Sequence, residues 1–331
     1  MAQIYSLDNA IAKFFHELRG VNRQQCEELA LSLVGPPLQP CRIQGAFSYT
    51  IRAGPGLAKI IQFRSEYLDM HVLECARLTF GTLVAACVHH GHIGNPSRLG
   101  VYVMDNLPGV TYIEARMAFP SLNGMSKEMC IWQNNVVVDL ARFFALSWKR
   151  PLKLNELEVT SCRNDMEQKL RLLSKTLPSP FSDTMTDLAN NVGILFSDSY
   201  PLVLTHDDLC EMNILVDSAT GNLTGVIDWA NASIQPFGLA LWGVENVFGY
   251  MDGTGWHYFG NYEQLKELFW RKFEEDAGVK TITLDFKENL KLARLVGIAL
   301  RYGYKWDNLK ETKPISTDDP SLRYLIAFLS G

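Results

Sequence analysis

Hydrophobic residues recur at helical spacing in the first part of the chain. Between Leu7 and Val34 they lie three or four positions apart, and Gly20 interrupts the pattern. The run Gly35–Pro37 follows, and proline ends a helix because it lacks the amide hydrogen and collides with the preceding turn. We therefore expect a helical N-terminal segment over residues 1–34.

The pattern then changes to short apolar runs separated by glycine, proline and polar residues, which is typical of strands and turns. Strands are expected at Cys41–Gln44, Tyr49–Arg52, Ala58–Phe63 and Gly100–Asp105, with turns at Gly45–Ser48 and Gly54–Gly56. Ser65 is a candidate N-cap for a helix from about Glu66 to Leu78. The apolar run Phe80–Val88 has about half of the ~20 residues that a membrane helix needs, so a buried helix is expected there.

Helical spacing returns after Asn106–Gly109, which is a candidate connector between two lobes. Helices are expected at Asn135–Trp148, Leu265–Phe273 and Leu290–Tyr302. One β-rich segment, Leu202–Asp228, interrupts this helical part. Two short runs in it are expected to pair as a hairpin around Asp217–Asn222, with Val216 opposite Leu223 or Thr224.

The hairpin brings three oxygen-bearing side chains together. Asn213 and Asp228 would face one another at its open end, and Asp208 enters from the preceding loop. Two oxygen ligands beside a third carboxylate suit Mg²⁺, which binds through one or two carboxylates plus substrate phosphates. Phosphoryl transfer uses such a set, with an uncoordinated Asp orienting the attacking hydroxyl. His206, Asp208, Asn213 and the later Asp228 also follow the spacing of the kinase catalytic loop and metal Asp.

Structural interpretations of the same residues stay open at this point. Asp208 could cap a loop, since short polar side chains favour turns, and Asn213 and Asp228 could simply end the hairpin. Cys210 lies four residues after His206, but a thiol nucleophile needs a spatially oriented base, so we interpret it as a spectator.

The segment resembles the motif of the aminoglycoside phosphotransferase and choline kinase group, and the chain is similar to uncharacterised fungal members of it. The resemblance spans roughly Gly35 to Phe273. Further support comes from Gln44–Thr50, Gln62–Arg64, Val101–Met104, Ile227–Trp229, Pro236–Gly238, Trp256 and Phe269–Trp270. The resemblance implies an α+β, protein-kinase-like fold. Its small β-rich N-lobe, with the nucleotide-binding sheet, would span residues 35–106, and its larger helical C-lobe, with the catalytic hairpin, residues 107–331.

The resemblance also implies ATP and Mg²⁺ as cofactors and a small molecule with a hydroxyl group as substrate. Asp208 would be the catalytic base, Asn213 and Asp228 the metal ligands, and His206 a structural residue of the loop. Residues implied in cofactor binding are Gly45, Ser48, Gln62, Arg64, Glu74, Met104 and Leu107.

Two positions depart from the pattern of the group. Asp207 stands where the group usually has glycine; it could raise the proton affinity of Asp208, contact the metal, or be a solvated loop residue. Gln62 stands at the position of the phosphate-binding lysine and brings no charge. Arg64 lies on the same strand face and could substitute, with Glu74 as its candidate ion-pair partner.

Composition narrows the function classes. With 31 Lys plus Arg against 36 Asp plus Glu the net charge is −5, which argues against a nucleic-acid partner. The seven cysteines show no spacing suited to zinc, and the first 15 residues lack the apolar stretch of a secretory signal. We therefore expect a cytoplasmic protein with no membrane partner; the oligomeric state stays open.

Substrate specificity would come from the helical lobe. Glu245, Asp252 and Trp256 follow the metal Asp and could bind an amine-bearing cation through a carboxylate and aromatic rings, or the aromatic residues could simply form the core. The main prediction is an ATP- and Mg²⁺-dependent small-molecule phosphotransferase. The alternatives are a kinase-fold pseudoenzyme or nucleotide-binding protein, and a repurposed pocket with other chemistry in a biosynthetic pathway.

Overall fold

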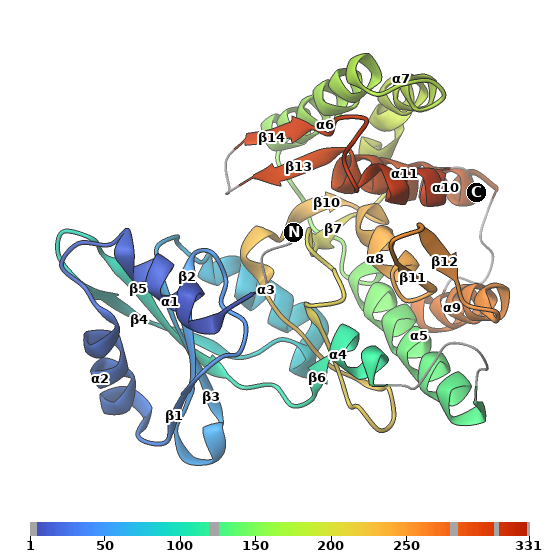
Figure 1. Ribbon diagram of the computed structural model, residues 1–331. Coiled ribbons are helices and arrows are strands. Elements are labelled where there is room, and N and C mark those ends of the chain that lie inside the picture. The colour runs from blue at the N-terminus through green and yellow to red at the C-terminus, as the bar shows by residue number, and fades with distance from the viewer. Residues whose placement is uncertain (1–4, 119–125, 279–283, 308–310, 330–331) are drawn as a thin grey trace. The chain divides into compact units, whose positions relative to one another are not determined.

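The computed structural model describes residues 5–118, 126–278, 284–307 and 311–329 (Figure 1). By its contacts the chain divides between Pro108 and Gly109 into two compact units, which are described separately below. The first unit carries a small antiparallel sheet and the second is mainly helical. The predicted α+β class is therefore confirmed. The predicted boundaries at residues 34 and 106 stay a prediction.

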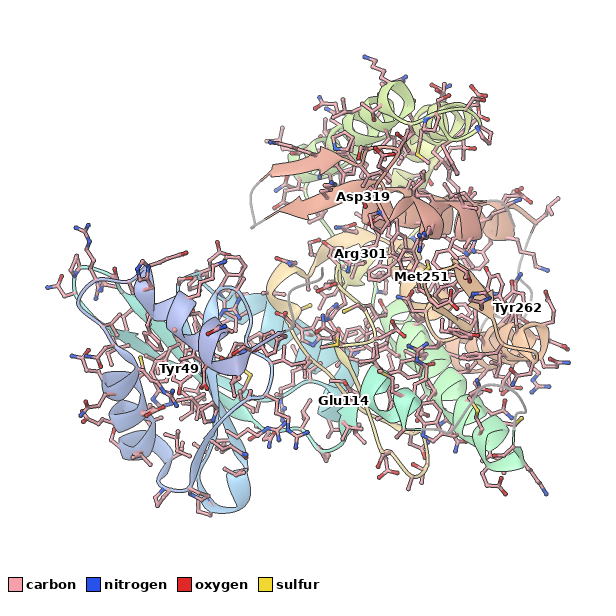
Figure 2. The ribbon with its side chains drawn as sticks, in the orientation of Figure 1. Tyr49, Glu114, Met251, Tyr262, Arg301 and Asp319 are labelled. Atoms are coloured by element: carbon pink, nitrogen blue, oxygen red, sulfur yellow. The ribbon has the colours of Figure 1, made fainter. Side chains whose placement is uncertain are left out.

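The first unit is built on a five-stranded antiparallel sheet in the order β1-β2-β3-β5-β4. Its strands are β1 Leu38–Pro40, β2 Ser48–Ala53, β3 Lys59–Arg64, β4 Cys87–Ile93 and β5 Leu99–Asp105. Helices α1 (Leu7–His16) and α2 (Arg23–Val34) pack against it through a shared apolar core. Tyr49 lies in that core (Figure 2) and donates a hydrogen bond to Glu27 of α2 at 2.6 Å. The predicted pair of helices broken near Gly20 is confirmed.

Three predicted elements of the first unit are wrong. The strand lies at Leu38–Pro40, not Cys41–Gln44, because the Gln44 side chain bonds the backbone of Cys41 and Thr50 and turns the chain. Helix α3 spans Met70–Phe80 and begins at Asp69, not Ser65, since the Asp69 carboxylate accepts from the first free amides. Residues 80–88 form no buried helix: α3 ends at Phe80, a short 3₁₀ turn covers Gly81–Leu83, and β4 begins at Cys87.

The second unit contains the predicted hairpin and most of the described helices. Its helices are α4 Tyr112–Met117, α5 Lys127–Trp148, α6 Glu156–Thr176, α7 Phe181–Asn191, α8 Trp242–Glu245, α9 Tyr262–Ala277, α10 Leu284–Tyr302 and α11 Leu322–Leu329. Its strands are β6 Val110–Thr111, β7 Leu202–Thr205, β8 Ile214–Val216, β9 Leu223–Val226, β10 Ser233–Pro236, β11 Gly249–Met251, β12 Trp256–Tyr258, β13 Tyr304–Asp307 and β14 Glu311–Pro314. No helix among the described residues is long and apolar enough to span a membrane.

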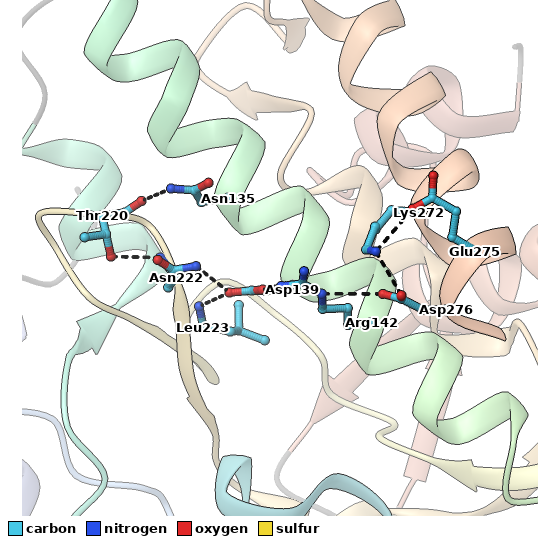
Figure 3. Close-up of polar contacts among 9 residues, drawn as sticks. All are labelled: Asn135, Asp139, Arg142, Thr220, Asn222, Leu223, Lys272, Glu275 and Asp276. Carbon is cyan, nitrogen blue, oxygen red and sulfur yellow. Dashed lines mark hydrogen bonds and ion pairs between the residues drawn. The ribbon is translucent and has the colours of Figure 1, made fainter.

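The hairpin β8–β9 has the predicted register, with Val216 opposite Leu223. Asp139 of α5 fixes its turn, because the carboxylate accepts from Asn222 Nδ2 at 2.9 Å and from the Leu223 amide at 3.0 Å (Figure 3). Asn135, one turn earlier on α5, donates to the Thr220 carbonyl at 2.8 Å. The turn that supports the site residues is thus anchored to the longest described helix of the unit.

We expect Asp139→Ala to lower the free energy of unfolding by about 1–3 kcal/mol, because two hairpin donors lose a charged acceptor. The Asp139 side chain is only 15% exposed, so water replaces it poorly. Urea denaturation measures the change. Glu167→Ala removes a carboxylate from an exposed ion pair on α6 and serves as control, with an expected change within about 0.5 kcal/mol. Equal effects of the two substitutions would contradict the anchoring role.

Candidate active site

His206 connects the end of β7 to the hairpin. Its Nε2 donates to the Ile227 carbonyl at 2.9 Å, and its Nδ1 accepts from the Asp208 amide at 3.2 Å. The buried ring packs edge-on against Trp229, with 4.7 Å between centroids. Burial lowers the pKa of His206, while the Ile227 carbonyl and the carboxylates of Asp208 and Asp228 act in the opposite direction. A neutral imidazole with its proton on Nε2 satisfies both hydrogen bonds.

Asn213 holds the loop that carries Asp208. Its Nδ2 donates to the Asp208 carbonyl at 2.8 Å and to Asp208 Oδ2 at 3.1 Å. The Asn213 carbonyl accepts from the Ile227 amide at 2.9 Å and closes the hairpin beyond the last strand pair. Asn213 is buried and Asp208 partly exposed. The spacing of Asp and Asn in the sequence therefore produces direct contact between their side chains.

Asp228 lies two residues after the end of β9 in a left-handed conformation, with φ 63° and ψ 59°. Asp tolerates this conformation better than most side chains do, and non-glycine residues that are held in it cluster at functional sites. The Asp228 side chain is exposed, and its charge acts on the same imidazole as that of Asp208. The described residues contain no group of three His, Cys, Asp or Glu side chains spaced to hold a metal.

Arg301, near the end of α10, was not predicted as a site residue. Figure 2 labels this residue. Its guanidinium lies 2.7 Å from Asp208 Oδ1 and 4.6 Å from the centroid of the Trp242 ring. The contact is an ion pair rather than an aligned hydrogen bond, because Oδ1 meets no donor at hydrogen-bond angles. A positive charge therefore faces the candidate catalytic carboxylate from a helix that the motif does not include.

Asp207 ties the same loop to the neighbouring strand β10. Its carboxylate accepts from Ser233 Oγ at 3.0 Å and from Gln235 Nε2 at 3.0 and 3.1 Å. These contacts exclude the solvated loop residue that was one alternative. Burial raises the pKa of Asp207 to about 7, although Ser233 and the charges of Lys169 and Arg301 act in the opposite direction.

The raised pKa of Asp207 predicts a pH dependence of stability. The folded chain keeps the Asp207 proton up to about pH 7, whereas an unfolded Asp releases it near pH 3.9. The retained proton therefore contributes fully to the free energy of unfolding below about pH 4. This contribution is lost as the pH rises through about 7. We expect Asp207→Asn, which keeps the acceptor oxygen, to remove that decline. Urea denaturation of both proteins at pH 5 and pH 8 measures it, and parallel changes would contradict the assignment.

The residues of the first unit expected to bind nucleotide lie on β2, β3 and β5, in the segments next to these strands, and on α3. Ser48 Oγ lies beside Gly45 and contacts Thr50 Oγ1 at 3.1 Å. On β3, Arg64 donates a hydrogen bond to Gln62 Oε1 at 3.1 Å, which agrees with their predicted position on one face of the strand. Glu74 is exposed on α3, and the described ion pairs do not include it. Met104 and Leu107 are half-buried at the end of β5. The binding roles of these residues stay a prediction.

A cavity of about 570 Å³ opens in the second unit beside Arg301. Its lining consists of Cys210, Glu211, Trp242, Asn246, Arg301, Tyr302, Tyr304, Lys305, Asp319, Ser321 and Tyr324. The three residues that the sequence proposed for substrate are not in this lining.

Those three residues make other contacts. Glu245 is buried and pairs with Arg294 at 2.6 Å. Asp252 accepts hydrogen bonds in the exposed turn between β11 and β12, including one from Thr254 at 2.7 Å. Trp256 packs edge-on against Phe328 of α11, with 4.9 Å between centroids. Trp256 thus packs against the helix whose Tyr324 lines the cavity. Direct contact of Glu245, Asp252 or Trp256 with a substrate stays a prediction.

Comparisons with known proteins bear on this site. The model of the family described as "Phosphotransferase enzyme family" matches residues 76–267, which include the loop and the hairpin. The Clavilactone A biosynthesis cluster protein Y of Ampulloclitocybe clavipes is 52% identical over 60 residues. That match covers 18% of this chain and only 15% of the length of the curated relative.

Solved structures of similar proteins cover most of the chain. The streptomycin–ATP–APH(2″)-IIa ternary complex is 14% identical with a TM-score of 0.48, covering 95% of this chain and 98% of that one. The aminoglycoside-3′-phosphotransferase of type VIII is 18% identical with a TM-score of 0.49 and coverages of 82% and 97%. The macrolide 2′-phosphotransferase MphH of Brachybacterium faecium is 14% identical with a TM-score of 0.47 and coverages of 84% and 91%.

Proposed function

The chain belongs to the phosphotransferase enzyme family, and from this membership we propose that it transfers the terminal phosphoryl group of ATP to a hydroxyl of a small molecule, with Mg²⁺ as the metal. Its small antiparallel sheet and larger helical unit are those of the protein-kinase-like fold that the sequence predicted. One observation carries the proposal: Asp208 and Asn213 are in direct contact, and His206 holds their loop to the hairpin that ends at Asp228.

The contacts of Asp208 support its proposed role as the carboxylate that orients the hydroxyl. Oδ2 accepts from Asn213 and Oδ1 faces Arg301, so the carboxylate has a fixed orientation. In the proposed reaction it accepts a hydrogen bond from the acceptor hydroxyl. It takes that proton as the hydroxyl oxygen bonds to phosphorus and the bond from phosphorus to the ADP oxygen breaks. Positioning accounts for most of the rate, because the transition state of phosphoryl transfer is loose.

The donor set at the hairpin fits Mg²⁺. Because Asn213 Nδ2 is used twice on Asp208, its amide oxygen is directed away from that residue and remains as a neutral ligand. Asp228 adds an exposed carboxylate at the open end of the same hairpin. These two residues would hold the ion, which would neutralise charge on the phosphate oxygens.

Nucleotide binding belongs to the first unit in this proposal. Arg64 is only 8% exposed, and its contact with Gln62 places a cation beside the uncharged residue that replaces the usual lysine. We assign the α- and β-phosphates to this pair, with Gly45 and Ser48 in the preceding turn. Adenine is assigned to the backbone of Met104–Leu107, where the Asn106 side chain donates to the Leu57 carbonyl at 2.9 Å and fixes the segment.

Thermal melting with Mg²⁺ and ATP tests nucleotide use. A ligand that binds only the folded state stabilises it by RT ln(1 + [L]/Kd), which is about 2.7 kcal/mol at a hundredfold excess over Kd. We expect millimolar Mg-ATP to raise Tm and ATP with EDTA to raise it less. An unchanged Tm at millimolar nucleotide would contradict the proposal.

The ion pair of Arg301 with Asp208 favours a second candidate, a nucleotide-binding protein that transfers no phosphate. The guanidinium occupies Asp208 Oδ1, where the acceptor hydroxyl could otherwise approach, and Gln62 removes a charge that kinases use. The two candidates differ in one result. Both predict the Tm shift with Mg-ATP, but only the enzyme adds phosphate to a component of a metabolite extract, as mass spectrometry would detect.

A further inference from the structure

The 570 Å³ cavity has the size of a small-molecule site, for which about 300–1,000 Å³ is usual. Its walls come from segments far apart in the sequence: the loop after Asp208, α8, the end of α10, β13 and α11. Arg301 lines it and pairs with Asp208, so the cavity adjoins the proposed catalytic carboxylate. All of these residues lie within the second unit.

The charges around this cavity compensate one another. Glu211 pairs with Arg116 at 3.3 Å, and Asp319 pairs with Lys305 at 3.0 Å. Asp208 pairs with Arg301 at 2.7 Å. Each acidic residue of the described lining therefore already has a cation, and the lining itself contains two acidic and two basic side chains. A cationic ligand would find no uncompensated carboxylate there, and an anionic ligand would have to displace one from its partner.

Aromatic rings supply most of the remaining lining. Tyr302 and Tyr324 stack with 4.5 Å between centroids and 10° between planes, and Trp242 meets Tyr302 edge-on at 6.0 Å. The Tyr302 hydroxyl donates to Asn246 Oδ1, and the Tyr304 hydroxyl donates to the Lys169 carbonyl. Burial raises the pKa of Tyr304 to about 12, so its hydroxyl stays neutral. Tyr302, Tyr304 and Trp242 are buried and Tyr324 is half-buried, so the lining offers a ligand the aromatic surface of Tyr324 rather than a charge.

We propose that this cavity binds an uncharged, flat molecule with a hydroxyl group, such as a phenol or another aromatic alcohol, as the phosphoryl acceptor. The role as acceptor rests on the proposed function, whereas binding does not. The ring packs on Tyr324, because aromatic pairs attract one another beyond the effect of the area that they bury. The compensated charges disfavour polycations and polyanions alike. The amine-bearing substrate suggested by the sequence is thus replaced by a neutral one.

Three phenols that differ in charge test this inference: 4-ethylphenol, tyramine and 4-hydroxyphenylacetate. Ligand-observed NMR titration of the full chain without nucleotide gives their Kd values. We expect 4-ethylphenol to bind at least about tenfold more tightly than either charged phenol. Equal or tighter binding of tyramine or 4-hydroxyphenylacetate would overturn the proposal, as would no binding of 4-ethylphenol at millimolar concentration.

Charge variants test the reason for the selectivity. Arg301→Gln leaves Asp208 without its cation, and Lys305→Gln does the same to Asp319. Each is expected to shift the Kd ratio towards tyramine by about tenfold. The Lys305 side chain is 54% exposed, so we expect Lys305→Gln to fold. It therefore tests the charge argument even if Arg301→Gln does not fold. Arg171→Gln, in an exposed pair on α6, is the control and leaves the ratio unchanged. An unchanged ratio in folded Lys305→Gln would overturn the charge argument.

Ligand binding in the cavity and phosphate transfer are measured separately. Selective binding of 4-ethylphenol without phosphate transfer to any hydroxyl would contradict the enzyme and leave the neutral aromatic site in place. Transfer of phosphate to a polycationic acceptor would support the enzyme and overturn the neutral aromatic site. A metabolite extract is therefore separated into cationic and neutral fractions, and each fraction is incubated with the protein and Mg-ATP. The fraction in which a component gains phosphate shows the charge of the acceptor.

Discussion

Asp208→Asn is expected to lower kcat by about 10²–10⁴, the range that a positioned general base contributes. Asparagine keeps the size of the side chain and its carbonyl oxygen, so the hydrogen bond from Asn213 at 3.1 Å can persist. The amide cannot take the hydroxyl proton. Steady-state phosphorylation of an accepted hydroxyl compound measures the loss, and the Tm shift with Mg-ATP should remain.

Asp217→Asn is the matched control for this substitution. Asp217 lies in the turn of the same hairpin, where its exposed carboxylate accepts from Thr220 Oγ1 at 2.9 Å and from two amides. Asparagine supports such turns equally well, so kcat should stay within about twofold of wild type. If Asp208→Asn kept wild-type turnover, the base would be elsewhere. Loss of the Tm shift with nucleotide as well would give Asp208 a structural role.

Asp228→Asn is expected to lower kcat at least about 100-fold and to weaken the dependence on Mg²⁺. Substitution of residues that only support metal ligands already lowers metal affinity or activity by about 10–100-fold. Substitution of a ligand itself should lower them more. Asparagine tolerates the left-handed conformation at φ 63°, so the substitution removes charge with little backbone strain. Titration of activity against Mg²⁺ concentration measures the change, which should appear as a raised half-saturating concentration.

Asp198→Asn provides the comparison for the metal prediction. Asp198 is an exposed turn residue before β7, and its loss removes the same charge from the same unit. Its Mg²⁺ titration should match that of wild type. If Asp228→Asn and wild type had the same Mg²⁺ titration, the ion would be bound by other residues. If Asp198→Asn and Asp228→Asn lost activity in parallel, the cause would be a general effect of charge.

The contacts of the candidate site that are local in the chain could be predicted from the sequence. The register of the hairpin follows from its turn composition, and the contact of Asp208 with Asn213 follows from a spacing of five residues. Arg301 could not be found in this way. It reaches Asp208 only because α10 packs beside the loop, and a helical pattern does not state which distant carboxylate an arginine will meet.

The missed strand β4 shows a different limit. Residues 87–93 alternate between half-buried and exposed positions, which is a strand signal, but the apolar run before them resembles a buried helix over a short window. Pairing with β5 decides between the two structures, and that pairing is not local. The same holds for the cavity, because its tyrosines come from α10, β13 and α11 and meet only in the folded unit.

The most direct test of the central claim uses ATP whose γ-phosphate carries heavy oxygen, incubated with Mg²⁺, a metabolite extract and either wild type or Asp208→Asn. Mass spectrometry then follows the label. We expect a product that gains one labelled phosphoryl group with wild type and at least about a hundredfold less of it with the variant. Equal labelling by both proteins, or no labelled product with wild type that binds Mg-ATP, would contradict phosphoryl transfer through Asp208.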